Sequence, residues 1–530
     1  MKRHFLLLFA LLSAAILKAQ DIDVQDYGFS IRLSDSSDKI HGVAYVKLKL
    51  LQSGNSFSLD LVQQGANGKG MLVEKVWDLD LRLGKDAMNL RWEQKNDKLI
   101  IHLPKNVLKD SMIKVVIQYS GIPKDGLIIS KNKYGDRTFF ADNWPNRAHH
   151  WIPCNDRPDD KATFSFSVTA PFKYDVICNG TKSMGSDLIT DPYSHTWNMS
   201  TPLSTKVMVI GAAKFAVKEY DNSPKGIPIS AWVYPQDSTN GFYDYALAVD
   251  IVKFFSNYIA PFPYQKLANV QSKTAFGGME NASCIFYNES SVTGTRRCED
   301  LLAHEIVHQW FGDMASEKSF AHLWLSEGFA TYLTDYYIEQ KYGKDSANYR
   351  LRSERQQVIS FASMSNQSVV DSTTNYMSLL NENSYQKGSW VLHMLRNEVG
   401  DNKFQTIIQT YYNTYKGSNA DTRDFEAVVE KVTGKNWKWF FDQWLYQGGI
   451  PKLHIEQKTD KDEVKLTITQ QGGSYKFPLE LAYKDANGKT ITQTIQIKEK
   501  ETSLKIKAGK TKEPLNLVID PNLKLLFTKS

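Results

Sequence analysis

The stretch Glu299-Asp-Leu-Leu-Ala-His-Glu-Ile-Val-His-Gln-Trp-Phe-Gly312 decides how the rest of the chain is interpreted. Acidic residues at its start suit the positive end of a helix dipole, and its final glycine suits a helix stop, so it predicts a helix. Positions i and i+4 share one face of a helix, which places the imidazoles of His304 and His308 side by side. Two such imidazoles can bind one Zn²⁺ at ~2.0–2.1 Å. Glu305 points about 100° away around the helix axis, where it can reach a water beside the ion.

A catalytic zinc site needs three protein ligands and one open position. Glu327 follows His308 after eighteen residues, within Leu323-Trp-Leu-Ser-Glu-Gly-Phe-Ala-Thr-Tyr332. This segment predicts a second helix, capped by Ser326, and the loop between the helices is long enough for it to return antiparallel. The pattern therefore predicts one zinc ion bound by His304, His308 and Glu327. The alternative is a structural helix with two partly buried histidines.

Three motifs resemble those of the M1 family of zinc aminopeptidases, which are gluzincins, and they follow one another along the chain as in that family. The first is His304-Glu305-x-x-His308 followed by Glu327. The second is Gly277-Gly-Met-Glu-Asn281, and the third is Tyr385-Gln-Lys-Gly388. With the β-rich regions on either side, the resemblance covers nearly the whole chain after residue 20.

The resemblance also implies roles for residues beyond the zinc ligands. An edge strand would pair with the substrate backbone; it comprises Gly277, Gly278, Met279, Glu280 and Asn281. Glu280 would bind the α-ammonium of a peptide, which would restrict cleavage to free N-termini. Glu305 would act as general base, and Tyr385 would donate a hydrogen bond to the oxyanion. From the residues alone, Glu280 could be an exposed charge on a strand, and Tyr385 could be a core residue of a helix over 385–398.

Two positions depart from the family pattern. In M1 enzymes a loop just before the segment that matches Trp151-Ile-Pro-Cys-Asn-Asp-Arg-Pro158 carries a Gln or Glu that contacts the first substrate side chain. Here the loop has Asp142 and Trp144, which become the candidates for that contact; the alternative is a purely structural loop. Many members also place a Glu seven residues after the ligand Glu, to support a zinc histidine. This chain has Thr334 there, beside Asp335, so either residue or a water could take that role.

Residues 1–20 predict a secretory signal peptide. A basic start, Lys2-Arg-His4, precedes thirteen mostly apolar residues, too few to cross a bilayer. Export to the periplasm or the medium is therefore expected, with an uncleaved membrane anchor as the alternative. No later stretch approaches eighteen apolar residues, so no membrane span is expected after residue 20. Without the leader the formal charge falls from +6 to about +3, too little to suggest a nucleic-acid partner.

The chain after the leader predicts a multidomain α+β protein. Residues 21–220 show short alternating segments, including Lys206-Val-Met-Val-Ile210, and predict an N-terminal all-β domain. Residues 221–450 predict the thermolysin-like catalytic domain, with a helix over 242–259. Residues 451–530 return to alternation around Asn487-Gly488, which predicts a hairpin and a small C-terminal β-sandwich. The long helical domain that follows in larger M1 enzymes is expected to be missing, which would leave the cleft more open.

Four cysteines in an exported protein could form disulfides. Cys284 and Cys298 lie on either side of the approach to the zinc helix, and they could either form a disulfide or remain two free thiols. Cys154 and Cys178 lie in β-rich sequence and suit buried thiols.

The function that this pattern favours is a zinc aminopeptidase, which removes single residues from peptides with a free N-terminus. Three alternatives remain open at this point. The same zinc site could serve an endopeptidase or an epoxide hydrolase, or the chain could be a catalytically silent binding protein.

Overall fold

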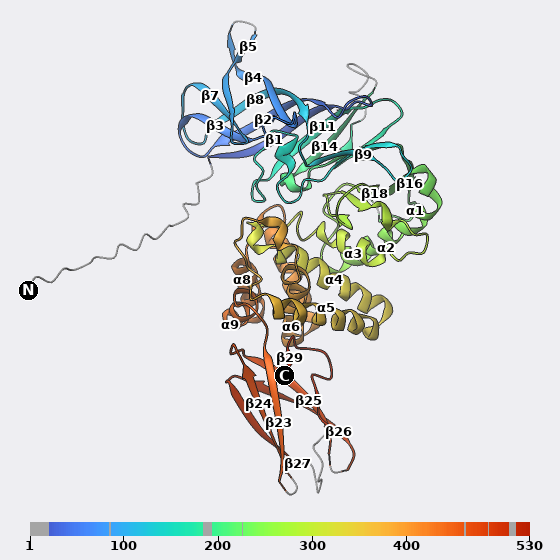
Figure 1. Cartoon of the computed structure of the whole chain (residues 1–530), viewed down its shortest axis with the longest axis vertical. Helices are drawn as coiled ribbons and strands as arrows, with labels where there is room; N and C mark the ends of the chain where they lie inside the picture. Colours follow the sequence, from blue (N-terminus) through green and yellow to red (C-terminus); the bar gives the residue numbers. More distant parts are fainter. Residues whose placement is uncertain are drawn as a thin grey trace, which may run out of the picture.

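A computed structural model describes residues 21–83, 86–183, 193–224, 226–460, 463–485, 487–507 and 516–530. The predicted signal peptide, residues 1–20, lies outside the described residues. Figure 1 shows a β-rich region at one end of the long axis, helices with a small sheet in the middle, and a second β-rich region at the other end. The arrangement confirms a multidomain α+β fold.

The N-terminal region is built from three sheets. Their strands are β1 (Ile22–Arg32), β2 (Ile40–Leu50), β3 (Gly54–Asp60), β4 (Gly70–Leu83), β5 (Asp86–Asn89), β6 (Arg91–Lys95), β7 (Lys98–Val107), β8 (Met112–Ile122), β9 (Leu127–Lys131), β10 (Arg137–Ala141), β11 (Ala162–Thr169), β12 (Asp175–Cys178), β13 (Thr181–Lys182), β14 (Ser194–Leu203) and β15 (Ile210–Ala213). The sheet orders are β13-β14-β11-β1-β2-β8-β4-β5, β12-β15-β10-β9 and β3-β7-β6. Alternate residues of the longer strands are buried, as in β2 and β11, which is the pattern of a sheet with one face on the core.

The predicted strand over 206–210 is wrong for most of its length. Its start is a 3₁₀ turn, η2 (Thr205–Val207), and β15 begins only at Ile210. Two asparagine side chains form hydrogen bonds with backbone groups that would otherwise have paired with a neighbouring strand. Asn143 Nδ2 donates to Thr205 O and Met208 O, while Asn179 donates to Val207 O and accepts from Val209 N.

The middle region packs helices against a five-stranded sheet. The sheet has the order β16-β17-β18-β20-β19, with β16 (Ala216–Glu219), β17 (Ile229–Val233), β18 (Leu267–Ser272), β20 (Cys284–Asn288) and β19 (Gly278–Met279). The helices are α1 (Ser238–Tyr245), α2 (Leu247–Tyr258), α3 (Glu299–His308), α4 (Trp324–Tyr342), α5 (Lys344–Met364), η7 (Asn383–Lys387), α6 (Gly388–Val399), α7 (Asp401–Tyr415), α8 (Thr422–Thr433), α9 (Lys438–Phe441) and η8 (Asp442–Tyr446). The single helix predicted over 242–259 is thus two helices that meet at Ala246. The short strand β19 forms the edge of the sheet, antiparallel to β20.

Helix α4 is the centre of the middle region, since it packs against α3, α5 and α6 and is buried along most of its length. Its crossing with α6 depends on two glycines. A Cβ built on Gly328 would lie 2.9 Å from Gly388 Cα, closer than real Cβ atoms approach. The close approach brings Glu327, one residue before Gly328, next to Tyr385, three residues before Gly388.

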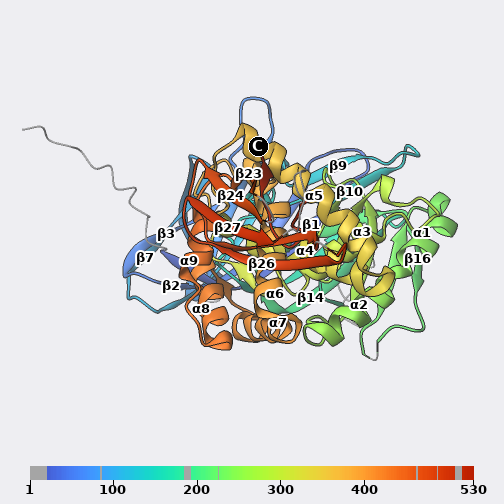
Figure 2. The ribbon, with the colours of Figure 1, turned by 90° about the horizontal axis from the view of Figure 1, so that it is seen from below.

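The C-terminal region is a small sandwich of two sheets. Their orders are β27-β24-β23-β29 and β26-β25-β28, with β23 (Lys452–Asp460), β24 (Glu463–Gln471), β25 (Phe477–Lys484), β26 (Thr490–Ile497), β27 (Glu501–Lys507), β28 (Val518–Ile519) and β29 (Thr528–Lys529). The hairpin predicted at Asn487-Gly488 is confirmed, because β25 and β26 pair antiparallel around it. Seen from below in Figure 2, these strands lie across the helices of the middle region.

All four cysteines are buried free thiols, so the bridge considered between Cys284 and Cys298 is not formed. Cys284 instead lies near Cys178, whose pKa is raised by burial and by the neighbouring Cys284. Within the described part of the chain, no helix is both long and apolar enough to cross a membrane.

Candidate metal and substrate site

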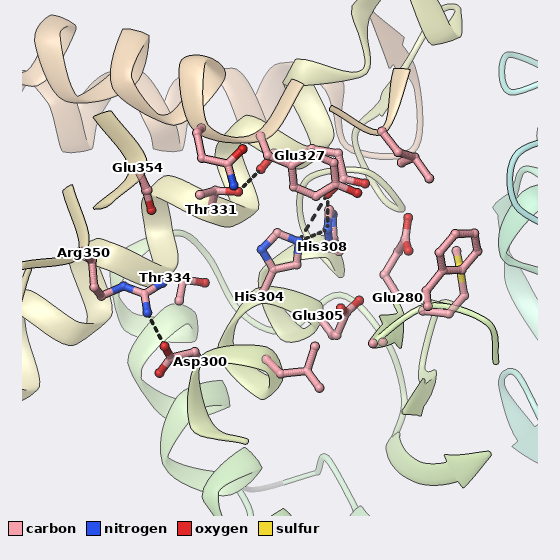
Figure 3. A pocket seen from close by; sticks show the side chains of 18 of the residues that line it. Glu280, Asp300, His304, Glu305, His308, Glu327, Thr331, Thr334, Arg350 and Glu354 are labelled. Carbon is pink, nitrogen blue, oxygen red and sulfur yellow. Dashed lines mark hydrogen bonds and ion pairs between the residues drawn. The ribbon is translucent and has the colours of Figure 1, made fainter. Parts of the chain in front are cut away.

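Two helices bring together a group of three side chains with the chemistry of metal ligands. Helix α3 supplies His304 and His308, and the first turn of α4 supplies Glu327 (Figure 3). The two Nε2 atoms are 3.1 Å apart, and Glu327 Oε2 lies 3.3 Å from His304 Nε2 and 3.2 Å from His308 Nε2. The ligand atoms of the three residues all lie within 4.8 Å of one another. One ion can therefore contact all three.

The other ring nitrogen of His308 fixes the orientation of its imidazole. Nδ1 lies 3.1 Å from Phe311 O and 3.0 Å from Ser326 Oγ. A carbonyl can only accept, so Nδ1 carries a proton, and Nε2 is the ring nitrogen that would bind a metal. Gly312 makes this contact possible, since a Cβ there would lie 2.3 Å from Ser326 Oγ and the residue has φ +118°. Ser326 was expected to cap α4, but it lies inside the helix and supports His308.

The charges of the site fit a divalent cation. Burial lowers the pKa of His308, but the carboxylates of Glu327, Glu280 and Glu305 outweigh burial and raise this pKa to about 10. Burial raises the pKa of Glu327, yet the two imidazoles hold it far below its usual value. Three carboxyl groups thus surround two imidazoles in a buried space and raise the pKa of His308, and the same groups would stabilise a cation bound between them. The donor set of two imidazoles and one carboxylate is that of catalytic zinc sites.

Glu305 lies beside the metal ligands without joining them. It is 5 % exposed, and burial raises its pKa well above the usual range, with Glu280 and Glu327 adding to the shift. Strand β19 passes directly over it, because Gly278 has no side chain to keep the two apart. The carboxylate is therefore held at the wall of the cavity, next to the metal ligands.

Tyr385 lies beside His304. The two rings are stacked with centroids 6.0 Å apart and planes at 13°. Burial raises the pKa of Tyr385 well above 10, and the nearby Glu327, Glu280 and Glu305 raise it further. The phenol therefore keeps its proton at neutral pH and can act as a hydrogen-bond donor. Its helix, η7, is a π-helix rather than the start of the regular helix predicted over 385–398.

Glu280 follows β19 and points into the same cavity. The residue is 5 % exposed, and its Oε1 has no hydrogen-bond partner among the described residues. Its backbone oxygen accepts a 2.6 Å bond from Gln309 Nε2, on the residue after His308. A buried, unpartnered carboxylate oxygen at a cavity wall calls for a donor from a ligand, and a free ammonium is the donor that carries the matching charge.

Two of the predicted substrate contacts are placed away from the cavity. Asp142 is fully buried, and its carboxylate accepts bonds from Arg147 and from Ala275 N, so its role is structural, contrary to the expectation. Asn281 is also fully buried and does not line the cavity. Trp144, by contrast, does line it, together with Gly277, Gly278 and Met279.

The support expected for His304 from position 334 or 335 takes a different form. Asp335 forms an ion pair with Arg350, which also binds Asp300. Thr334 lines the cavity, and its Oγ1 is buried without a partner in the described part of the chain. Neither side chain is hydrogen-bonded to His304, which leaves a water as the candidate for that role.

Sequence reasoning missed Ser326 and Gln309. Ser326 holds a metal ligand, and Gln309 joins α3 to the strand region through Glu280 O and Ser283 N. Their only signal was position: each directly adjoins a predicted ligand in sequence. The ligand-bearing group opens onto a cavity of about 650 Å³ that is large enough for a peptide end.

Comparison with known proteins gives matches along most of the chain. The family model described as "Peptidase M1 N-terminal domain" matches residues 24–207, and that described as "Peptidase family M1 domain" matches residues 243–444. "Probable aminopeptidase 2" of Sulfurisphaera tokodaii is 29 % identical over 414 residues, covering 73 % of this chain and 52 % of that protein. "Probable aminopeptidase 1" of the same organism is 25 % identical, covering 84 % and 56 %.

A human protein named "Glutamyl aminopeptidase" is 26 % identical over 363 residues, covering 65 % of this chain and 37 % of that protein. The chain thus spans about half, or less, of the length of these relatives.

Proposed function

Because the chain belongs to peptidase family M1, we propose that it is a zinc-dependent aminopeptidase that removes single residues from the free N-termini of peptides. One observation carries the proposal. The trio His304, His308 and Glu327 lines the same cavity as Glu280, whose Oε1 has no partner among the described residues, so a metal site and an ammonium site open onto one cavity. That pairing suits cleavage of the first peptide bond.

The metal contributes one part of the chemistry. A zinc ion held by His304, His308 and Glu327 would acidify a water and polarise the scissile carbonyl. Glu305 accepts the proton of the attacking water and passes it to the leaving amine. Burial raises the pKa of Glu305, which makes its carboxylate a stronger proton acceptor.

The remaining groups position the peptide. Glu280 binds the α-ammonium and sets the register at one residue per turnover. The edge strand β19 offers its backbone groups to the substrate backbone. The protonated phenol of Tyr385 donates a hydrogen bond to the oxygen of the carbonyl as charge develops on it.

Glu280 also favours this function over an endopeptidase on the same site. A peptide blocked at its N-terminus would bury the carboxylate without its cationic partner, which is costly. The sequence of residues 1–20 further supports export as part of the proposal, to the periplasm or the medium.

The test is a panel of aminoacyl-arylamides, each also in N-acetylated form, assayed before and after chelation and after zinc is restored. We expect turnover of free substrates only, loss with chelator and recovery with zinc. Equal turnover of acetylated substrates would indicate an endopeptidase. A folded, zinc-loaded protein with no turnover of any substrate would indicate a binding protein.

A further inference from the structure

The cavity has two sides of different chemistry, separated by the proposed metal ligands. Figure 3 shows Glu280 on one side of His304 and Glu305, with Asp300, Thr334, Arg350 and Glu354 on the other. The second group is polar and charged. Trp144, Phe276 and Met279 also line the cavity; Phe276 and Met279 belong to the segment that leads to Glu280, and Trp144 contacts Phe276, so the side of Glu280 carries mostly apolar side-chain surface.

The apolar side is backed by a row of rings from four distant segments, which we call the aromatic wall: Phe276, Trp144, Phe320 and Tyr376. Successive ring centroids are 6.1, 5.8 and 4.7 Å apart. Trp144 and Phe320 are 2 % and 3 % exposed, whereas Phe276 is half-buried and faces the cavity. Two of these ring pairs are packed edge to face and the third is tilted, and rings packed closely in this way form a rigid surface that an apolar side chain can contact at little entropic cost.

The position of the wall identifies the part of a peptide that would meet it. In the proposed function the α-ammonium lies at Glu280 and the first carbonyl at the metal ligands, so the first Cα lies between them. Met279 lies in the edge strand β19, one residue before Glu280, and Phe276 lies in the segment that leads into this strand. The side chain that projects toward this wall is therefore that of the first residue.

Three positive groups of the described residues lie near the wall, and each is paired with a carboxylate; Arg157, a neighbour of Tyr376, pairs with Asp159. Lys206 lies 5.9 Å from the Phe320 ring centre, but it is 1 % exposed and paired with Glu317. Arg147 lies 5.9 Å from the Phe276 ring centre and is paired with Asp142 and Asp125. An acidic first side chain would lose its hydration without gaining a cation, and it would also face the like charge of Glu280.

We propose that this protein is selective for a large apolar first residue, such as leucine, methionine or phenylalanine, and rejects aspartate and glutamate. The inference rests on the proposed aminopeptidase function and adds to it the class of substrate. Trp144 and Phe276 determine the selectivity. Several relatives bear the name glutamyl aminopeptidase. The residues of this wall instead predict a preference for apolar first residues in this protein.

The experiment compares arylamides of leucine, methionine, phenylalanine, alanine, lysine and glutamate with the full-length, zinc-loaded protein. We expect kcat/KM for the three large apolar residues to exceed that for glutamate by at least about 100-fold. Isothermal calorimetry with free phenylalanine and free glutamate gives a second measurement, independent of turnover, and phenylalanine should bind more tightly.

Substitutions test whether the wall is responsible. Trp144→Ala should reduce the preference, but Trp144 is buried and its loss could impair folding. Phe276→Arg places a cation at a half-buried position of the wall, and it should raise the glutamate-to-leucine ratio of kcat/KM at least about 10-fold. Phe172→Arg makes the same change at a side chain that is 84 % exposed, and should alter neither rate nor preference.

The outcomes separate the two proposals. The selectivity would be overturned if glutamate substrates were turned over as fast as leucine substrates or faster. It would also be overturned if Phe276→Arg left the preference unchanged. Neither result would contradict the proposed aminopeptidase function. No turnover of any arylamide by folded, zinc-loaded protein would overturn the function, and the selectivity with it.

Discussion

Gly278 lies against the carboxylate of Glu305, so closely that a Cβ built on Gly278 would be 2.4 Å from Glu305 Oε1. Real Cβ atoms essentially never approach another atom below 3.0 Å. The edge strand and the proposed general base are therefore packed as one unit. This contact explains why position 278 is a glycine, which the motif alone did not explain.

Gly278→Ala should displace Glu305 and lower kcat/KM at least about 10-fold, because small misplacements of a catalytic group are costly. The zinc content should stay unchanged. Gly54→Ala is a control away from the cavity, since its Cβ would meet nothing closer than Ser56 O at 3.7 Å. Equal activity of the two variants would show that the contact does not matter.

Glu305→Gln should lower kcat by about 10²–10⁴-fold, since the amide cannot accept the proton of the attacking water. Metal analysis should find as much zinc as in the wild type, because Glu305 is not among the three ligands. Retained turnover would refute the assignment of Glu305 as the base. Loss of zinc would instead place it among the ligands.

Tyr385→Phe should reduce kcat by about 10²–10³-fold with little change in KM, because the phenol is proposed to donate only to the charge that develops during the reaction. The stacking of the ring on His304 can persist in phenylalanine, so the fold should be unaffected. Steady-state kinetics decide the point: a rise in KM alone would make Tyr385 a binding residue.

Lys206→Met should cost about 3–5 kcal/mol of unfolding free energy, since it leaves Glu317 charged without a partner. The pair joins the N-terminal region to β21 (Ser316–Glu317) of the middle region, and both side chains are almost completely buried. Adding Glu317→Leu should recover most of the loss. Urea unfolding of the two single variants and the double variant measures this, and a single-variant loss below about 1 kcal/mol would argue against the pair.

His393 makes stability depend on pH. Burial lowers its pKa from 6.5 to about 4, and its Nε2 lies 2.9 Å from Leu523 O in the C-terminal region. Between pH 6.5 and 4, His393 is protonated in the unfolded chain but stays neutral in the folded protein. Its contribution to stability is therefore present above pH 6.5 and is lost as the pH falls toward 4.

His393→Gln removes this titration, while its amide can still donate to Leu523 O. The wild type should therefore lose on the order of 2–3 kcal/mol relative to the variant between pH 7 and pH 4. Urea unfolding at both pH values checks this. A difference that does not change with pH would exclude His393 as the titrating group.

Local features of the sequence predicted local structure well. The i, i+4 spacing of His304 and His308 matches their convergence on one face of α3, and the second helix runs from Trp324 to Tyr342, close to the predicted span. Asp421 caps α8 with a full capping box, a local arrangement of the same kind. Such features depend on a few neighbouring residues, so spacing and propensity determine them.

What the sequence determined by itself was the inventory of the site: a metal-binding pair on one helix, a third ligand on the next, a glycine-containing edge strand and a tyrosine. Tertiary structure alone decided that Asp142 pairs with Arg147 while Trp144 faces the cavity, and that Ser326 supports His308. The aromatic wall likewise joins rings separated by up to about 230 residues of chain, from Trp144 to Tyr376. The physical reason is that the direction in which each of these side chains points is set by three-dimensional packing, which no short-range periodicity encodes.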